Sequence, residues 1–375
     1  MSPIQGVRQS GKSFLVREIL KSSKPQLSYV TFDQRIEKNR AAANPETFLL
    51  SYDEAFPLVI DEAQKVPDIF DALKYEADTR RRPGKFLILG STEFSKETLI
   101  RESLTGRMAR LCLFPFNIKE AQGSVLEPQI MTEKKKISLT RIELLKHLKK
   151  GGFPGIFAVR DNAEHQSLLQ DWLQISLYRD LMLFPRRKPD PELAYDILKC
   201  CAINEDTSAP AIASYLKKDP RRVKSHIELL LILFILHPLP PFPGSSGQTH
   251  YFLCDSGLAT YLGAEIERQL HTQLIIERMS QHMYQYGDLP RLYFYRGAKG
   301  KIIHLVEKQN TLVFAYQIFS EEKILDRDLI RLKSFKDKMV KYQPAQRTNV
   351  YGLAAFHTPT RMVDNIWMLP WESMA

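Results

Sequence analysis

The sequence lacks a long hydrophobic run. In 375 residues the longest uninterrupted apolar stretch is Leu229–Leu236, far short of the roughly 18 residues that indicate a membrane-spanning helix. No basic segment followed by an apolar stretch opens the chain, so we expect no secretory signal peptide. The four cysteines, at 112, 200, 201 and 254, form neither a metal-binding spacing nor a disulfide framework. We therefore expect a cytoplasmic protein with no membrane partner.

The sequence also lacks a strong excess of one charge. Lys and Arg number 53 and Asp and Glu number 43, a net charge of +10, which permits a nucleic-acid partner without requiring one. Hydrophobic residues make up 44% and charged residues 26% of the chain, as is usual for globular proteins. These values exclude a collagen, a coiled coil and a chain that is disordered throughout. The length suggests two or three domains.

What the first third does contain is an alternation of short apolar strands with helical stretches. The expected strands are Leu27–Phe32, Pro57–Ile60, Phe86–Leu89 and Leu111–Phe114. Continuous apolar strands separated by helices are typical of a parallel sheet that is covered on both faces. We therefore predict an α/β fold with a parallel sheet for this part of the chain.

A phosphate-binding pattern precedes the first of these strands. Residues 6–13, Gly-Val-Arg-Gln-Ser-Gly-Lys-Ser, fit G-x-x-x-x-G-K-[ST] at every fixed position. Glycines let backbone N–H groups curl around a phosphate, and the helix that follows points its positive end at the anion. Lys12 is expected to reach the β- and γ-phosphates of ATP, and Ser13 to hold Mg²⁺. The other residues expected to contact the nucleotide are Gly6, Arg8, Gln9, Ser10 and Gly11. The alternative is a Gly-Ser turn that only caps a helix.

Two later strand ends carry side chains that suit the same site. The strand at 57–60 is followed by Asp61 and Glu62. In P-loop ATPases an Asp at this place orders the Mg²⁺ shell and a Glu polarises the attacking water. Ser91 follows the next strand and is a candidate sensor of the γ-phosphate. The acidic pair could also be an ordinary strand end, but the three features in this order predict a site for ATP and Mg²⁺.

The start of the chain fits this pattern less well. A P-loop normally follows a strand in the middle of the sheet, yet only five residues precede Gly6. One of them, Pro3, lacks the N–H that a central strand must donate. Either a very short strand suffices, or the sequence is truncated at its start.

These motifs resemble those of the prokaryotic AAA-type ATPases that carry a C-terminal domain of unknown function, and the resemblance covers nearly the whole chain. In the first part it is carried by Gly6–Ser13, Val59–Gln64 with Val66-Pro67, Leu89–Ser91, Glu102–Arg107, Phe114–Phe116 and Glu120. Later it is carried by Gly151–Pro154, Tyr178–Asp180, Leu239–Pro241, Tyr251-Phe252 and Asp255–Leu258.

The resemblance implies an AAA-like fold, ATP with Mg²⁺, and an arginine that faces the nucleotide or a neighbouring subunit. Arg107 matches that position and Arg110 is the nearby alternative. A permanently charged, planar group there could neutralise transition-state charge. The alternative is that Arg107 has only a structural role and forms a salt bridge with Glu102. AAA relatives often assemble into rings, so self-association is a candidate property.

The middle of the chain predicts three helices and a hairpin. The helices are expected at Leu193–Cys201, at Ala211–Lys217 and from Pro220 onward, followed by a Pro- and Gly-rich wing at His237–Cys254. This order suggests a winged helix-turn-helix. Its third helix would present Arg221, Arg222 and Lys224 near its N-terminus, where a recognition helix contacts DNA. Alternatively, these residues form a solvated face and the module binds a protein.

The tail resembles, within the same family, a restriction-endonuclease-like fold that has lost its acidic groups. Strands are expected at 292–295, 302–306 and 312–318, and a helix at 328–339. Ile302 and His304 stand where the family pattern has acids, and Gln317 and Phe319 stand at its Glu and Lys places. Strand alternation puts Glu307 on the face opposite His304, so the carboxylate oxygens that Mg²⁺ requires are lacking. We expect a structural or binding module and no nuclease activity.

The sequence thus predicts four domains. These are an AAA-like P-loop ATPase domain at 1–125, a helical lid or linker at 126–190, a winged helix-turn-helix at 191–265 and a degenerate endonuclease-like α/β domain at 266–375. The leading hypothesis is a Mg²⁺-dependent ATPase that couples its nucleotide state to C-terminal domains contacting DNA or protein. The alternative is a nucleotide-bound scaffold or switch that does not hydrolyse ATP.

Overall fold

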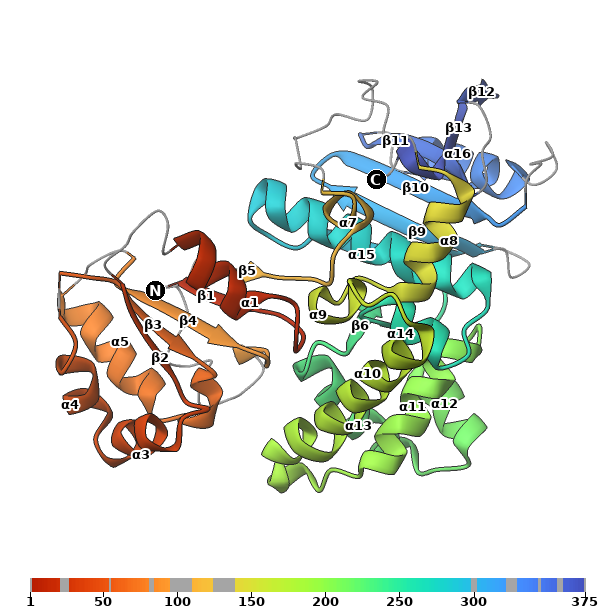
Figure 1. The fold of residues 1–375 in the computed structure, drawn as a ribbon. Coiled ribbons are helices and arrows are strands. Elements are labelled where there is room, and N and C mark those ends of the chain that lie inside the picture. The colour runs from red at the N-terminus through yellow and green to blue at the C-terminus, as the bar shows by residue number, and fades with distance from the viewer. Residues whose placement is uncertain are drawn as a thin grey trace. The chain divides into compact units, whose positions relative to one another are not determined.

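The computed structural model describes residues 2–20, 27–53, 55–80, 84–94, 110–123, 139–297, 302–321, 329–342, 345–355 and 360–373 (Figure 1). The chain divides into two compact units. Unit 1 comprises Met1–Phe114, Leu230–Ile235 and Tyr286–Asp288, and unit 2 comprises Pro115–Leu229, Leu236–Gln285 and Leu289–Ala375. Within the described ranges, no helix combines the length and apolar character needed to cross a bilayer.

Unit 1 is built on a five-stranded parallel sheet. Its strands lie in the order β2 (Ser28–Thr31), β3 (Leu58–Asp61), β4 (Phe86–Gly90), β1 (Ser2–Gln5) and β5 (Leu111–Cys112). Its helical segments are α1 (Lys12–Phe14), η1 (Leu15–Leu20), α3 (Arg35–Ala43), α4 (Pro45–Leu50), η2 (Ala63–Lys65) and α5 (Ile69–Arg80). The predicted α/β fold is confirmed, and the four predicted strands are β2, β3, β4 and β5.

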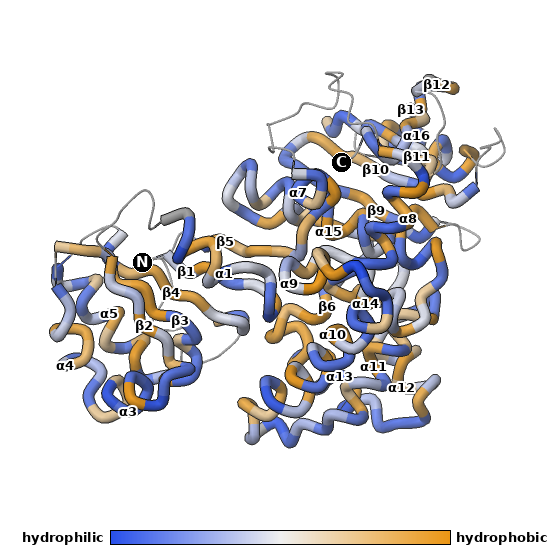
Figure 2. The backbone as a smooth tube through the Cα atoms, in the orientation of Figure 1, coloured by the Kyte–Doolittle hydropathy of each residue, from blue (hydrophilic) through white to orange (hydrophobic). Residues whose placement is uncertain are grey.

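Alternation along the strands gives each face of this sheet its own core. Leu58 and Ile60 of β3 pack in one cluster with residues of α3, α4 and α5, such as Phe70. Val59, which lies between them, packs with Val16 of η1 in the cluster on the other face. Figure 2 shows β3 and β4 in hydrophobic colours, as expected for strands covered on both faces. The polar residues at the strand ends are therefore held by a sheet that is packed on both faces.

The very short first strand takes a full place in the sheet. It pairs over Ser2–Gln5 with β4 and over Ile4–Gln5 with β5. The Gln5 carbonyl accepts a hydrogen bond from the Leu113 N–H at 2.7 Å, so by alternation the backbone nitrogen of Pro3 also points toward the β5 side. Pairing with β5 begins only at Ile4, and Pro3 therefore removes no bond from the β4 ladder.

Unit 2 begins with helices and a hairpin. The elements are α7 (Ile118–Ala121), α8 (Arg141–Lys150), α9 (Pro154–Phe157), α10 (Asn162–Ile175), η4 (Ser176–Asp180), η5 (Leu181–Leu183), η6 (Pro185–Arg187), α11 (Pro191–Ile203), α12 (Ala209–Leu216), α13 (Pro220–Ile232, its last turn in unit 1) and the antiparallel strands β6 (Leu236–Leu239) and β7 (His250–Leu253). Asp219 caps α13 by accepting from the Arg221 N–H at 2.9 Å. The predicted helices and hairpin strands are present, and the winged helix-turn-helix interpretation stays a prediction.

The first half of the predicted wing is bound to the C-terminal sheet. The Phe294 N–H in β8 (Arg291–Arg296) donates to the Pro240 carbonyl at 3.0 Å, and the Phe242 N–H donates to the Phe294 carbonyl at 2.7 Å. The Phe242 ring is buried and lies 6.0 Å from the Phe335 ring, centroid to centroid. This segment therefore covers part of the exposed edge of β8, and those backbone groups are committed within the fold.

The rest of unit 2 is a six-stranded mixed sheet with helices on both faces. Its strands lie in the order β12 (Arg361–Val363), β13 (Ile366–Pro370), β11 (Arg347–Ala354), β10 (Leu312–Phe319), β9 (Ile302–Gln309) and β8. Helix α15 (Ile266–Tyr286) packs in the core cluster of one face and α16 (Ile330–Tyr342) in that of the other. Helix α14 (Ser256–Tyr261) precedes α15, and η9 (Trp371–Ser373) follows the last strand. The predicted strands and helix of the tail are present as β8, β9, β10 and α16, whereas β11, β12 and β13 were not predicted.

The prediction that Glu307 lies on the face opposite His304 is wrong. Strand β9 contains an irregularity at which its register with β8 shifts, and such a bulge resets the alternation of side chains. Both residues consequently contact α15. The His304 ring lies 5.1 Å from the His271 ring, and Glu307 forms an ion pair of 2.8 Å with Arg278.

Both of these candidate ligands already have partners within the fold. His304 Nδ1 accepts a hydrogen bond from the Ile318 N–H at 3.1 Å, so a neutral His304 carries its proton on Nε2, which faces Gln317. Burial acts to raise the pKa of Glu307, but the Arg278 charge and donated hydrogen bonds lower it to about 2. Among the described residues no three His, Cys, Asp or Glu side chains form a metal-binding group. The expected lack of nuclease activity stays a prediction.

Candidate nucleotide site

The loop that follows β1 adopts backbone conformations that few residues tolerate. The angle φ is 149° at Gly6, 62° at Gln9 and 89° at Gly11. A Cβ atom at Gly6 would lie 2.1 Å from the Leu113 carbonyl oxygen, which is closer than any non-bonded contact. Glycine is therefore required at this position, as it is where backbone N–H groups must curl around an anion. The local geometry fits a phosphate cradle.

Lys12 lies folded into this loop. Its Nζ donates to the Gly6 carbonyl at 2.9 Å, to the Val7 carbonyl at 2.8 Å and to Ser10 Oγ at 3.4 Å. The residue is 6% exposed, and a buried ammonium group needs such oxygen partners. Of the other predicted contact residues, Ser10 is buried, Arg8 is half-buried and Gln9 is exposed.

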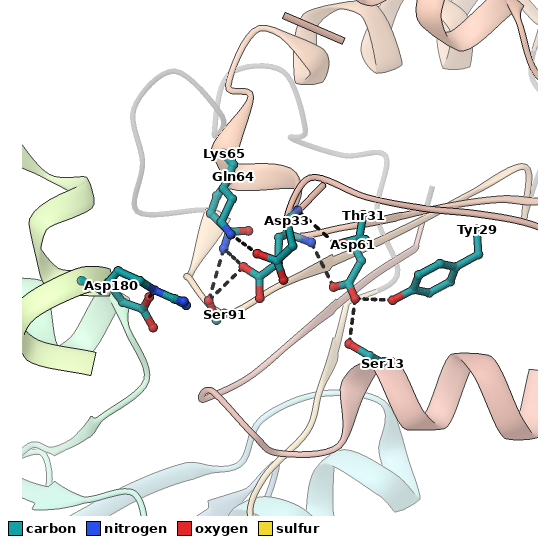
Figure 3. Close-up of polar contacts among 11 residues, drawn as sticks. Ser13, Tyr29, Thr31, Asp33, Asp61, Gln64, Lys65, Ser91 and Asp180 are labelled. Carbon is teal, nitrogen blue, oxygen red and sulfur yellow. Dashed lines mark hydrogen bonds and ion pairs between the residues drawn. The ribbon is translucent and has the colours of Figure 1, made fainter. Parts of the chain in front are cut away.

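The two residues predicted to hold Mg²⁺ are in direct contact. Ser13 Oγ donates to Asp61 Oδ2 at 2.7 Å, across 48 residues of sequence. The Tyr29 hydroxyl donates to the same oxygen, and the Glu62 N–H donates to Asp61 Oδ1 at 2.9 Å (Figure 3). The Asp61 carboxylate is thus fixed toward the loop.

Tyr29 is a site residue that the sequence did not reveal. Burial, followed by its contact with Asp61, raises its pKa to about 12, so it remains a hydrogen-bond donor at neutral pH. The Arg17 guanidinium lies 4.4 Å from the centre of its ring. The sequence does show a polar aromatic residue in a predicted strand. It does not show that this strand pairs with β3, which is what brings Tyr29 to Asp61.

The second acid, Glu62, lies beside Ser91 and a further unpredicted residue, Gln64. Gln64 Nε2 donates to the Glu62 carboxylate and, at 3.2 Å, to Ser91 Oγ. Ser91 Oγ lies 3.4 Å from Glu62 Oε2. Burial raises the pKa of Glu62, and the charge of Lys12 opposes this rise. Figure 3 shows Gln64, in η2, and Ser91, which follows β4, turned toward each other.

Of the two candidate arginines, the structure describes Arg110. Arg107 lies outside the described residues, so its role stays a prediction. Arg110 forms an ion pair of 3.0 Å with Glu93 and donates to Cys112 Sγ at 3.0 Å. Its guanidinium also faces the Phe234 ring at 5.9 Å. Arg110 therefore has partners within unit 1.

The three basic residues of α13 are not equivalent. Arg221 and Lys224 are exposed and lie three residues apart, on one face of the helix. Arg222 is 57% exposed and pairs with Asp190 at 2.8 Å. Any contact with an external partner would therefore rest chiefly on Arg221 and Lys224.

Two family models match separate parts of the chain. Residues 1–122 match an AAA domain, and residues 141–270 match a domain of unknown function, DUF8612. The N-terminal third is thus similar to AAA-type P-loop ATPase domains, in agreement with the resemblance found in the sequence. The second match gives no function for the helical and hairpin region.

Two proteins from prokaryotes match about half of this chain. The uncharacterized protein Rv2008c of Mycobacterium tuberculosis is 29% identical over 188 residues, which are 50% of this chain and 37% of that protein. The uncharacterized protein MJ1544 of Methanocaldococcus jannaschii is 30% identical over 188 residues, 48% of this chain and 41% of that protein. The match thus spans well under half the length of either relative.

Two solved structures align with the chain only weakly. A RuvB structure from Thermotoga maritima aligns with a TM-score of 0.28 at 14% identity, covering 71% of this chain and 87% of its own. Protein VC1899 of Vibrio cholerae aligns with a TM-score of 0.21 at 9% identity, covering 99% and 94%. Likenesses this weak carry no assignment of function.

Proposed function

We propose that unit 1 binds Mg²⁺-ATP and hydrolyses it. The observation that carries the proposal is the 2.7 Å hydrogen bond between Ser13 Oγ and Asp61 Oδ2. It joins a P-loop hydroxyl to a strand-end carboxylate, the two protein groups that a Mg²⁺ ion bound to nucleotide phosphates uses as ligands. The required Gly6 and the buried Lys12 support the same reading.

Each residue then has a role that follows from its position. Lys12 would exchange the carbonyls of its own loop for the β- and γ-phosphate oxygens. Ser13 and Asp61 would hold Mg²⁺, which supplies positive charge against the phosphates. Glu62 would accept a proton from the attacking water, and Ser91 would donate to the γ-phosphate. The backbone cradle would comprise Gly6, Arg8, Gln9, Ser10 and Gly11, and Arg107 would add positive charge.

Phosphate release from ATP by the purified chain tests this proposal. We expect steady release in Mg²⁺ and loss of release in excess EDTA, because neither Ser13 nor Asp61 can neutralise the phosphates without the ion. ATP that binds but is not hydrolysed in Mg²⁺ would favour the nucleotide-bound scaffold or switch instead. Release that continues in EDTA would contradict the assignment of Ser13 and Asp61.

A second candidate function is contact with DNA through the start of α13. The favouring observation is that Arg221 and Lys224 are exposed on one face of the helix, near its N-terminus. Phosphate contacts of this kind would supply affinity without sequence information. The first half of the wing is hydrogen-bonded to β8 through Phe242. We therefore assign the DNA contact to the helix. A protein partner at the same surface is the competing possibility.

A salt series of duplex-DNA binding distinguishes these partners. Binding through phosphates must weaken steeply with salt, and each neutralised phosphate contributes about 0.9 to the log–log slope. Changing both Arg221 and Lys224 to Ala should therefore reduce that slope by roughly 2. Lys199→Ala is the matched control, because Lys199 is an exposed lysine of α11 with no assigned role in DNA contact. An unchanged slope in the double variant, or no binding at low salt, would remove DNA contact by this helix.

A further inference from the structure

Gln64 is a residue of this site to which the proposed function assigns no role. It lies in η2, the short helix that begins directly after Glu62. The φ angle of Glu62 is 55°, and this conformation turns the chain back toward β4. The turn brings the Gln64 side chain to Ser91 at the end of that strand. The residue is 8% exposed, so its amide group has little access to water and depends on partners within the fold.

The amide nitrogen of Gln64 joins two residues of the proposed site. It donates to Glu62 Oε2 and to Ser91 Oγ, while Ser91 Oγ itself lies within reach of the same carboxylate oxygen (Figure 3). An ionised carboxylate only accepts hydrogen bonds. The amide must therefore present its nitrogen, not its oxygen, to Glu62. The three side chains form a closed set of contacts between the ends of β3 and β4.

The amide oxygen of Gln64, by contrast, is unsatisfied. Among the residues that the structure describes, no donor lies within hydrogen-bond distance of Gln64 Oε1. It lies close to the β4 backbone, since a Cβ atom at Gly90 would be only 2.9 Å from it. Native folds rarely leave a buried carbonyl oxygen unpaired without a functional reason. A side chain needed only for packing here could be apolar, so the contact with Glu62 is the reason for an amide.

We propose that Gln64 is a positioning residue for ATP hydrolysis, holding the Glu62 carboxylate at the end of β3 while Glu62 accepts the proton of the attacking water. This inference rests on the proposed ATPase function. In that reaction the water oxygen bonds to the γ-phosphorus, and the bond from this phosphorus to the oxygen bridging to the β-phosphorus breaks. One water proton passes to Glu62, and ADP and phosphate leave.

Gln64 takes no proton in this step and acts only through Glu62. When the Ser91 hydroxyl turns to the γ-phosphate, its contact with Glu62 is given up. The Gln64 nitrogen then remains as the side-chain donor that keeps the carboxylate from rotating. A carboxylate without that donor would spend less time in line with the water, and a small misplacement of a catalytic group is enough to slow the chemical step strongly.

The Gln64→Met variant tests this inference by separating kcat from nucleotide binding. Methionine has a similar length and volume but no donor, and it removes the unpaired oxygen. We expect kcat to fall about 10- to 100-fold, the Kd for Mg²⁺-ATP to change less than about threefold, and the unfolding temperature not to fall. Gln64→Glu, which keeps the shape but replaces the donor with an acceptor, should lose at least as much kcat. Gln34→Met, at an exposed glutamine of the same unit, is the matched control.

Two results would overturn the inference. The first is a Gln64→Met variant with the kcat of the wild type. The second is a loss of kcat that follows a loss of folded protein or of ATP affinity, which would assign Gln64 a structural role. Failure of the proposed function is distinguishable, because a wild-type chain that releases no phosphate contradicts hydrolysis itself and the role of Gln64 with it. An active wild type with an equally active Gln64→Met variant contradicts the role of Gln64 alone.

Discussion

Replacement of Glu62 with Gln is expected to abolish ATP hydrolysis and to leave ATP binding intact. Glutamine has nearly the shape of glutamate but cannot accept the proton of the attacking water. Positioned general bases contribute about 100- to 10,000-fold to rates, so we expect kcat to fall at least about 100-fold. The Glu62 carboxylate accepts hydrogen bonds from Gln64 and Ser91 and interacts with Lys12 through charge, so the replacement removes none of the hydrogen bonds that Lys12 forms in the loop. The rate is measured as phosphate release, and the Kd by calorimetric titration with Mg²⁺-ATP.

The control for this variant is Glu46→Gln. Glu46 is an exposed acid in the first turn of α4, in the same unit but away from the strand ends, and its replacement should change neither kcat nor Kd. A Glu62→Gln chain that hydrolyses ATP at the wild-type rate would show that Glu62 is not the base. A chain that has lost ATP binding as well would show that Glu62 serves the binding site.

Replacement of Lys12 with Ala is expected to remove measurable ATP binding. In our proposal the amine of Lys12 donates to two phosphates. Hydrogen bonds to charged groups contribute about 1.5 to 3 kcal/mol each, so the loss of two should weaken binding at least about 100-fold. Calorimetric titration of Mg²⁺-ATP into the variant measures this loss directly.

Lys65→Ala is the matched control for the loss of a positive charge. Lys65 is the last residue of η2 in the same unit and pairs with Asp33, and its side chain is 18% exposed. We expect this variant to retain ATP affinity within about threefold. If Lys12→Ala bound Mg²⁺-ATP as tightly as the wild type, residues 6–13 would be a helix-capping turn and no phosphate loop.

The sequence predicts the parts of this fold whose signals are local. Strands β3 and β4 are apolar runs that end in Asp61 and Gly90, and the loop glycines are fixed by backbone conformation. Because carboxyl ends of parallel strands meet at one edge, the contact between Ser13 and Asp61 follows from the same pattern. The helix start at Pro220 likewise follows from proline at the first turn, whereas α11 begins at Pro191, two residues before the predicted Leu193.

What the sequence could not predict depends on contacts between distant segments. Tyr29 reaches Asp61 only because β2 pairs with β3, and Gln64 reaches Ser91 only because Glu62 adopts a left-handed conformation. The capture of Phe242 by β8 joins residues about 50 positions apart in sequence, which no local pattern encodes. The face of Glu307 was predicted wrongly for a related reason. The bulge in β9 depends on its partner strand, so it is not visible in the sequence of β9 alone.

Thermal unfolding of the wild-type chain over a range of Mg²⁺-ATP concentrations tests most directly whether unit 1 is a nucleotide-binding domain. A ligand that binds only the folded state adds about 2.7 kcal/mol of stability at 100 times its Kd, which should raise the unfolding temperature of unit 1 by several degrees. We predict a rise that grows with concentration and is absent with Mg²⁺ alone. An unfolding temperature that stays the same at every Mg²⁺-ATP concentration would contradict it.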